Sequence, residues 1–456
     1  MSTTQQQLDY IERFLVYDIY KYFGSGASLV SHSVESSNGL DGFMSALYTV
    51  QLDLEIADRK QKELVLVKFM KGTEHFRASS NSYIQFANEV YAYAEILPAY
   101  EHLLRSSRLS SDVVTGWVPR SYAARYGQID GLSESCESVL ALKHLKEDGY
   151  ELGPRLVLRR DQLEAMVGLV GPFHALGYAT RILQPQVYER LRSGVVPMPF
   201  VSSTGKGVFE VLYRVAFDRF YGFYDRQKKQ LLQQEQDEGF AAALERLRKK
   251  YFAQPEQLME RIRTSSFDES QPDSYFCTFL HGDFNRNNVL FHYDAAGTVD
   301  NIKTIDFQEL RFSTTAIDLS FFMYMNTPPD DREEIFADLL KKYHKKMIEM
   351  LELVLQRNQD ELSEERVQQL LADYSFERFE AHFKRYAFYG AMVVMHFLPW
   401  LLSNETDCAE LSRLFETDMH SPAFHQLSLD IGGDVANLEI FKVVRHAYEH
   451  GYMDEI

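Results

Sequence analysis

Three side chains suited to holding a divalent cation follow short apolar runs in the middle of the chain. Asp283 and Asn288 lie in the polar break between the apolar run that ends at Leu280 and the one that starts at Val289. Asp306 follows the strand-like segment 300–305. Carboxylate and amide oxygens are the hard ligands that Mg²⁺ prefers. The pattern therefore predicts an Mg²⁺ site at the edge of two short strands. The alternative is a surface loop in which these side chains only cap turns.

The spacing of the three side chains is that of a kinase catalytic loop. Such loops place a catalytic Asp five residues before a metal-binding Asn, and a second Asp follows one hairpin later. In this chain Asn288 follows Asp283 by five residues, and Asp306 comes 18 residues after Asn288. We therefore predict a catalytic role for Asp283 and metal binding for Asn288 and Asp306. This interpretation requires a nucleotide-binding part upstream.

Upstream, a lysine and a glutamate fit that requirement. Lys68 lies among apolar residues of the strand-like segment 63–70, so its ammonium should be half-buried and in need of an anionic partner. Glu89 follows 21 residues later in a helical segment. A strand lysine held by a helix glutamate orients its ammonium onto nucleotide phosphates. The alternative is a lysine that extends along a strand edge into solvent.

A glycine-bearing loop precedes this strand. Gly39 and Gly42 are separated by two residues, and Ser45 follows them. Glycine allows backbone N–H groups to approach phosphates closely. The same composition also occurs in ordinary hairpin turns, so the loop alone does not decide between a phosphate site and a turn.

The predicted secondary structure changes from strands to helices near residues 139–146. Before this point strand patterns dominate, whereas afterwards long helical patterns with apolar stripes prevail. Strand 136–142 runs into the polar connector that begins at Lys143 and contains His144. We predict an α+β, bilobal fold with an N-terminal nucleotide-binding lobe, 1–142, and a mainly helical catalytic and acceptor-binding lobe, 143–456. Leu142 and His144 would then contact adenine, mainly through backbone groups.

Length, charge and cysteine content exclude several classes of protein. A chain of 456 residues exceeds what one core usually covers. The net charge of −18 disfavours nucleic-acid binding. Three scattered cysteines suggest reduced thiols rather than disulfides or a zinc cluster. No signal peptide or membrane-spanning run is visible. We expect a soluble cytoplasmic protein without a membrane partner, and both a monomer and a homodimer remain open.

The aromatic segment 208–224 offers a candidate for an acceptor site. Tyr213, Phe217, Tyr221 and Tyr224 share one face at helical spacing. Such a face usually packs into a core, but it would also suit a bulky apolar substrate. The short distance between Asp306 and Asp318 leaves no room for a peptide-docking loop. The acceptor is therefore expected to be a small molecule.

Together these residues resemble the ecdysteroid kinase-like family, within the aminoglycoside phosphotransferase and choline kinase group of protein-kinase-like folds. The resemblance covers about residues 30–400 and is most specific in the two blocks around 281–291 and 305–322. The matching elements are the loop 38–45, Val67-Lys68, Phe86 to Glu89, Phe173-His174-Ala175, His281 to Phe291, Ile305 to Gln308, Arg311 and Ala316 to Phe322.

The resemblance implies an ATP- and Mg²⁺-dependent phosphotransferase. Asp283 would act on the acceptor hydroxyl, Asn288 and Asp306 would bind Mg²⁺, and Lys68 would neutralise phosphate charge. His281 and Asp318 are interpreted as structural. The family usually carries Glu-Asp in the connector where this chain has Lys143-His144, which leaves the choice between ATP and GTP open.

The same resemblance suggests the acceptor class. It points to a hydroxyl of an ecdysteroid, or of a xenobiotic or plant secondary alcohol. Two alternatives stay open: a choline- or ethanolamine-type kinase, and a pseudokinase-like protein that binds ligand without phosphoryl transfer.

Overall fold

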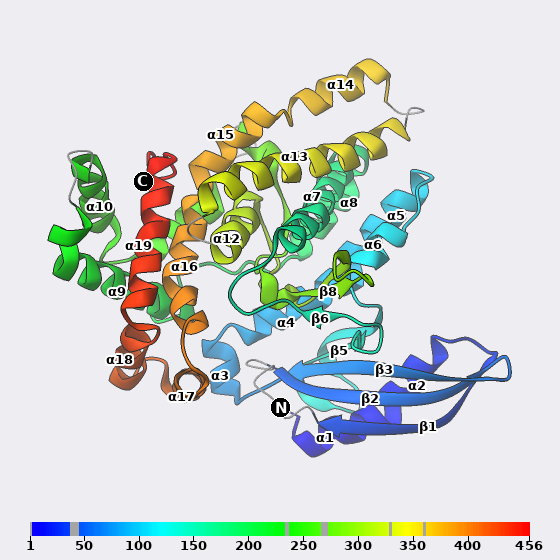
Figure 1. The fold of residues 1–456 in the computed structure, drawn as a ribbon. Coiled ribbons are helices and arrows are strands. Elements are labelled where there is room, and N and C mark those ends of the chain that lie inside the picture. Colours follow the sequence, from blue (N-terminus) through cyan, green and yellow to red (C-terminus); the bar gives the residue numbers. More distant parts are fainter. Residues whose placement is uncertain (1, 37–44, 233–236, 266–271, 328–330, 359–361) are drawn as a thin grey trace. The chain divides into compact units, whose positions relative to one another are not determined.

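The computed structural model describes residues 2–36, 45–232, 237–265, 272–327, 331–358 and 362–456 (Figure 1). The chain divides into two compact units. Unit 1 comprises 1–152, 193–196 and 289–310, and unit 2 comprises 153–192, 197–288 and 311–456. The lobe boundary predicted between residues 142 and 143 remains a prediction. Throughout the described ranges, no helix combines the length and apolarity needed to cross a membrane.

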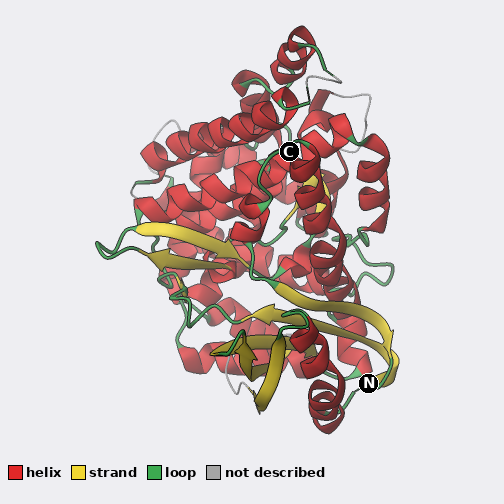
Figure 2. Ribbon diagram, turned by 90° about the vertical axis from the view of Figure 1, so that its right-hand side faces the viewer, coloured by secondary structure: helices red, strands yellow, loops and turns green. Residues whose placement is uncertain are grey.

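Unit 1 is built on an antiparallel five-stranded sheet with the strand order β1-β2-β3-β5-β4. Its strands appear as yellow arrows in Figure 2. Their bounds are β1 Ala27–Ser36, β2 Ser45–Ile56, β3 Arg59–Met70, β4 Ser121–Ile129 and β5 Ser133–Lys143. Burial alternates along β2 and β3, so one face of the sheet is apolar.

The N-terminal helical segment covers that apolar face. It consists of α1 Thr4–Tyr10, a π-helical turn Ile11–Leu15 and α2 Val16–Lys21. Ile11, Leu15 and Ile19 are fully buried against strand residues such as Val50 and Val67. This packing gives unit 1 its own hydrophobic core.

Unit 1 also contains further helices and a second, smaller sheet. The helices are α3 Glu74–Ser79, α4 Ser82–Tyr91, a π-helical turn Ala92–Ile96, α5 Leu97–Ser106 and α6 Asp112–Trp117. A second sheet has the order β6-β8-β9, with β6 Glu151–Leu152, β8 Val289–Tyr293 and β9 Val299–Thr304. A short 3-10 helix, η5 Phe307–Glu309, follows β9. Trp117 ends α6, and β4 begins at Ser121.

Unit 2 is mainly helical. Its helices before the segment 272–314 are α7 Arg160–Leu183, α8 Pro185–Gly194, α9 Val208–Leu231, α10 Asp237–Tyr251 and α11 Glu256–Ser265. After that segment come α12 Ala316–Asn326, α13 Arg332–Gln356, α14 Glu364–Ala372, α15 Phe376–Tyr386, α16 Phe388–Leu401, α17 Glu405–Asp418, α18 Pro422–Asp430 and α19 Gly433–Glu449. Strands β7 Cys277–Leu280 and β10 Arg311–Thr314 pair antiparallel.

A close helix contact fixes α12 in unit 2. The Gly390 N–H on α16 donates to Ser320 Oγ on α12 at 3.0 Å. A Cβ at residue 390 would lie 2.2 Å from the Ser320 carbonyl oxygen. Only glycine therefore allows the two helices to approach this closely.

The antiparallel sheet of unit 1 and the helices of unit 2 confirm the predicted α+β class.

Candidate active site

Lys68, Glu89 and Asp306 form a charge cluster within unit 1. Lys68 Nζ lies 2.8 Å from Glu89 Oε2 and 3.0 Å from Asp306 Oδ1. The side chain of Lys68 is 12% exposed and that of Glu89 is 2% exposed. Lys68 Nζ also lies 5.5 Å from the centre of the Phe86 ring. One ammonium thus faces two carboxyl groups in a largely desolvated environment.

This imbalance perturbs the ionisation of the cluster. Burial raises the pKa of Glu89, Lys68 opposes the rise and Asp306 adds to it, so that the pKa reaches about 7. Burial lowers the pKa of Lys68, but the two carboxyl groups outweigh it and leave that pKa raised. Lys68 therefore stays charged, while one carboxyl group lacks a full counter-charge. A cation beside Asp306 would relieve that deficit.

Helix α4 positions both acidic partners. Gln85 Nε2 donates to Glu309 Oε1 at 2.7 Å, and Asn88 Nδ2 donates to Leu310 O at 3.3 Å. These bonds hold the segment after Asp306 against α4. Asp306 itself has φ 65°, a left-handed conformation that is uncommon for a residue with a side chain. Such strain often occurs at functional sites.

The segment 281–288 in unit 2 holds Asp283 in a network of amides. Asp283 Oδ2 accepts from Asn288 Nδ2 at 2.8 Å, and Oδ1 accepts from Asn285 Nδ2 at 2.7 Å. The Asn285 side chain also accepts from the Asn287 N–H at 2.9 Å. The residues Arg286–Asn288 form a 3-10 turn, so residues five apart can meet. The Asp283 carboxylate is therefore oriented by the carboxamides of two neighbours in the same loop.

Asp318, on α12, binds the start of this loop. Its carboxylate accepts from the N–H groups of His281 and Gly282, both at 2.8 Å. His174 Nε2 lies 3.2 Å from Asp318, and His174 Nδ1 lies 2.8 Å from the Tyr343 hydroxyl. Asp318 and His174 are fully buried. This buried chain links α7, α12 and α13 to the loop that carries Asp283.

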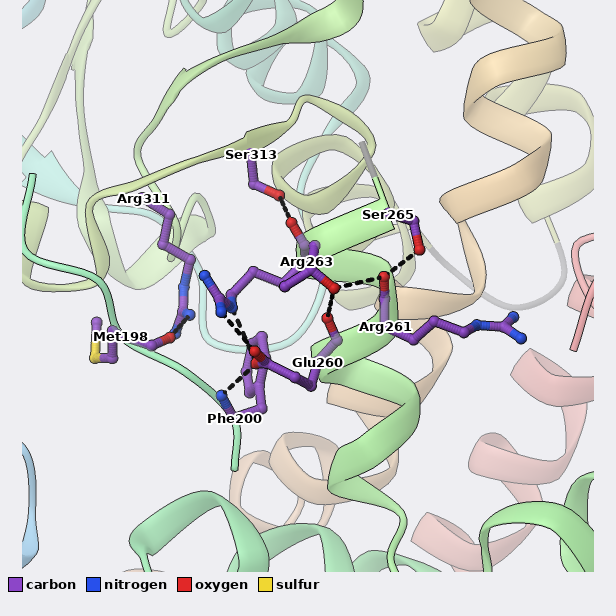
Figure 3. Close-up of polar contacts among 9 residues, drawn as sticks. Met198, Phe200, Glu260, Arg261, Arg263, Ser265, Arg311 and Ser313 are labelled. Atoms are coloured by element: carbon purple, nitrogen blue, oxygen red, sulfur yellow. Dashed lines mark hydrogen bonds and ion pairs between the residues drawn. The ribbon is translucent and has the colours of Figure 1, made fainter. Parts of the chain in front are cut away.

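Arg311 anchors the strand beside the loop (Figure 3). Its Nη1 donates to the Met198 carbonyl at 2.6 Å, and its guanidinium lies 4.4 Å from the centre of the Phe200 ring. Glu260 accepts from the Phe200 N–H at 2.9 Å and from Arg263 Nε at 2.9 Å. Because Arg311 pairs with Leu280 across β10 and β7, these contacts hold β7 immediately before the loop.

A family model decides the affiliation of the chain. The model described as the ecdysteroid kinase-like family matches residues 39–356, which is more than half of the chain. The chain belongs to the ecdysteroid kinase-like family. The resemblance to this family inferred from the motifs is thereby confirmed. The family supports a small-molecule kinase.

Other comparisons add little to this affiliation. A solved structure described as the GDP and kanamycin complex of APH(2")-IIia is 15% identical. The match covers 81% of this chain and 98% of that chain, with a TM-score of 0.35. No curated protein matches the chain.

The nucleotide-contact residues predicted for this family member are only partly described. Gly39 and Gly42 lie outside the described residues. Ser45 begins β2, is buried and pairs with Met70. Leu142 is buried on β5, and the His144 N–H donates to the Leu64 carbonyl at 2.8 Å. That N–H is therefore already used within the protein, and a nucleotide would have to bind through other groups of the connector.

The four predicted acceptor rings lie inside unit 2. Tyr213, Phe217, Tyr221 and Tyr224 on α9 are each at most 4% exposed. The Tyr221 hydroxyl donates to the Leu244 carbonyl at 2.9 Å, and the Arg248 guanidinium lies 5.0 Å from its ring centre. The ring face is thus covered by α10 and supports the core interpretation.

Two further side chains of this loop hold it in place. Asn285 contributes directly to the orientation of Asp283, and its spacing of two residues from Asp283 is a signal that could have identified it. Arg286 also lies in this loop. It is 3% exposed and donates to the Leu156 carbonyl at 2.7 Å. Burial, with Arg155 nearby, lowers its pKa to about 10. The hydrogen bond to the Leu156 carbonyl anchors the loop.

Proposed function

We propose that this chain is a Mg²⁺- and ATP-dependent kinase that phosphorylates a hydroxyl group of a small molecule. The acceptor we propose is an ecdysteroid, or a xenobiotic or plant secondary alcohol. The observation that carries the proposal is the desolvated Lys68 ammonium, which is held by Glu89 and Asp306. A kinase needs such a cation for the phosphates of its nucleotide.

The donor set of the site fits Mg²⁺. Asn288 and Asp306 offer the oxygen ligands that this ion prefers, and the carboxyl groups around Lys68 exceed its single positive charge. These two residues would hold the ion, which would neutralise charge on the phosphates.

Four side chains have separate roles in the proposed phosphoryl transfer. Asp283 accepts the proton of the acceptor hydroxyl. At the same time the hydroxyl oxygen bonds to the γ-phosphorus, and the bond between that phosphorus and the β-phosphate oxygen breaks. Asn285 and Asn288 donate to the Asp283 carboxylate and fix its direction. Lys68 stabilises negative charge on the nucleotide. Positioning and electrostatics thus supply most of the acceleration.

The segment after Asp306 supports a small acceptor. It passes through η5 and β10 and enters α12 at Ala316. These elements are consecutive and leave no loop long enough to dock a peptide in the way protein kinases do. The burial of the four α9 rings means that a bulky acceptor would have to be recognised by other residues.

A single-turnover assay with labelled ATP and Mg²⁺ tests this function. The panel contains polyhydroxylated steroids, plant phenols, choline, ethanolamine and an aminoglycoside. We expect label transfer to a steroid or phenolic hydroxyl by the wild type and no transfer by Asp283→Ala. Transfer only to choline or ethanolamine would replace the proposed acceptor class. Nucleotide binding without transfer to any acceptor would favour a ligand-binding protein.

A further inference from the structure

Three potential metal ligands converge in unit 2, outside the proposed kinase site. His446 lies in the last turn of α19, and His450 follows it by four residues, so both imidazoles share one helix face. Glu333 lies in the first turn of α13. Glu333 Oε2 is 2.9 Å from His450 Nε2 and 3.7 Å from His446 Nε2. The three ligand atoms all lie within 4.8 Å of one another.

The buried histidine of this cluster has a nitrogen without a hydrogen-bond partner. His446 is 8% exposed. Its Nδ1 lies 3.0 Å from the Tyr324 hydroxyl, whereas its Nε2 is buried and makes no hydrogen bond. The 3.7 Å separation from Glu333 is too long for one. A buried polar atom without a hydrogen bond destabilises the fold. A ligand bound to this nitrogen would remove that cost.

The hydrogen bond at Nδ1 of His446 is compatible with the tautomer that a metal site needs. A neutral imidazole carries a lone pair on one ring nitrogen. When Nδ1–H donates to Tyr324, that lone pair lies on Nε2. A second-sphere hydrogen bond of this kind commonly fixes the tautomer of a metal-bound histidine.

We propose that Glu333, His446 and His450 bind one transition-metal ion of the Zn²⁺ class. Two imidazoles and one carboxylate are an established donor set for Zn²⁺, with water in the fourth position. Bonds of about 2.0–2.1 Å in a tetrahedral site place neighbouring ligand atoms roughly 3.4 Å apart. The observed separations bracket that value. Glu333 is 75% exposed on its side chain and can rotate to complete the site.

A simple ion pair between Glu333 and His450 is the competing explanation. It would account for the 2.9 Å contact but leaves His446 Nε2 unsatisfied. The Arg332 guanidinium opposes a nearby cation, but it donates to the carbonyl and hydroxyl of Thr327, and the Glu333 carboxylate adds a compensating charge. A bound ion would join the end of α19 to the start of α13. It should therefore stabilise unit 2 independently of phosphoryl transfer.

Titration of Co²⁺ into the chain of 456 residues tests the proposal. Excess Mg²⁺ is present to occupy hard-oxygen sites. We expect about one equivalent to bind with visible d–d bands and without an intense thiolate charge-transfer band. His450→Ala and Glu333→Gln should each weaken binding at least as much as the 10- to 100-fold that loss of a second-sphere partner typically causes. His425→Ala, at a surface histidine that lies 3.1 Å from Asp218, is the matched control and should bind normally.

A thermal readout completes the test. Zn²⁺ should raise the unfolding temperature of the wild type and of His425→Ala but not that of His450→Ala, because an ion bound only by the folded chain stabilises it. Absence of saturable Co²⁺ binding would overturn the proposal. So would wild-type affinity in the Glu333 and His450 variants, or a thiolate band that assigns the ion to a cysteine.

Discussion

Replacing Lys68 by methionine should show how strongly Lys68 lowers the pKa of Glu89 in the cluster of Lys68, Glu89 and Asp306. Methionine keeps much of the side-chain volume but removes the ammonium that lies 2.8 Å from Glu89. Lys68 is the group that lowers the pKa of Glu89, whereas burial and Asp306 raise it. In Lys68→Met the pKa of Glu89 should therefore rise above its wild-type value of about 7.

The sign and size of the effect follow from proton linkage. The folded state raises the pKa of Glu89 above its ordinary 4.5, so it favours the protonated carboxyl group. This contribution to stability is complete below about pH 4.5 and is lost as the pH rises to about 7 in the wild type. In Lys68→Met the loss continues above pH 7 at about 1.4 kcal/mol per pH unit. Between pH 7 and pH 8.5 the variant should thus lose about 2 kcal/mol more than the wild type.

Urea unfolding at pH 6.0 and pH 8.5 measures this difference. The gap in unfolding free energy between wild type and Lys68→Met should widen by about 2 kcal/mol at the higher pH. Glu89→Gln is the matched control: in that background Lys68→Met should produce no widening, because the titrating carboxyl group is gone. If chains that retain Glu89 showed a gap of equal size at both pH values, the reasoning would be refuted.

Two further predictions concern the catalytic loop and the α9 rings. Asp283→Ala should abolish phosphoryl transfer, while calorimetry should still detect binding of Mg²⁺-ATP. Asp306→Ala should weaken both transfer and binding, because of these two residues only Asp306 is a proposed metal ligand. Normal turnover by Asp283→Ala would contradict the assignment. Phe217→Ala should cost about 3–5 kcal/mol of unfolding free energy, as for other buried aromatic residues, with the acceptor KM unchanged in the folded fraction. A raised KM at unchanged stability would instead place Phe217 against the acceptor.

Local pattern predicted most elements of the sheet and the long helices. The alternation along β2 and β3 and the apolar stripe of α13 are strong signals, because each side chain reports directly which face is buried. The pairing of Lys68 with Glu89 could be predicted because an ammonium in an apolar strand needs a counter-charge. The structure places these two partners 2.8 Å apart although 21 residues separate them.

Other features depend on contacts that the local sequence does not encode. Helices α17 and α18 were not predicted, because their few buried residues, such as Leu411 and Phe424, give only a weak stripe. The role of the α9 rings also could not be predicted from the local sequence. A buried ring and a ligand-facing ring require the same helical spacing, so only the position of α10 over Tyr221 favours the core.

The polar chain beneath the loop 281–288 explains how this loop is held in one conformation. Asp318 is fully buried, and its carboxylate would be costly there without partners. Two loop N–H groups and His174 supply those partners. The same bonds remove freedom from His281 and Gly282, immediately before Asp283. The desolvation of one carboxylate is thus offset by contacts that orient another, which is why a buried acid outside the proposed reaction can still determine where Asp283 points.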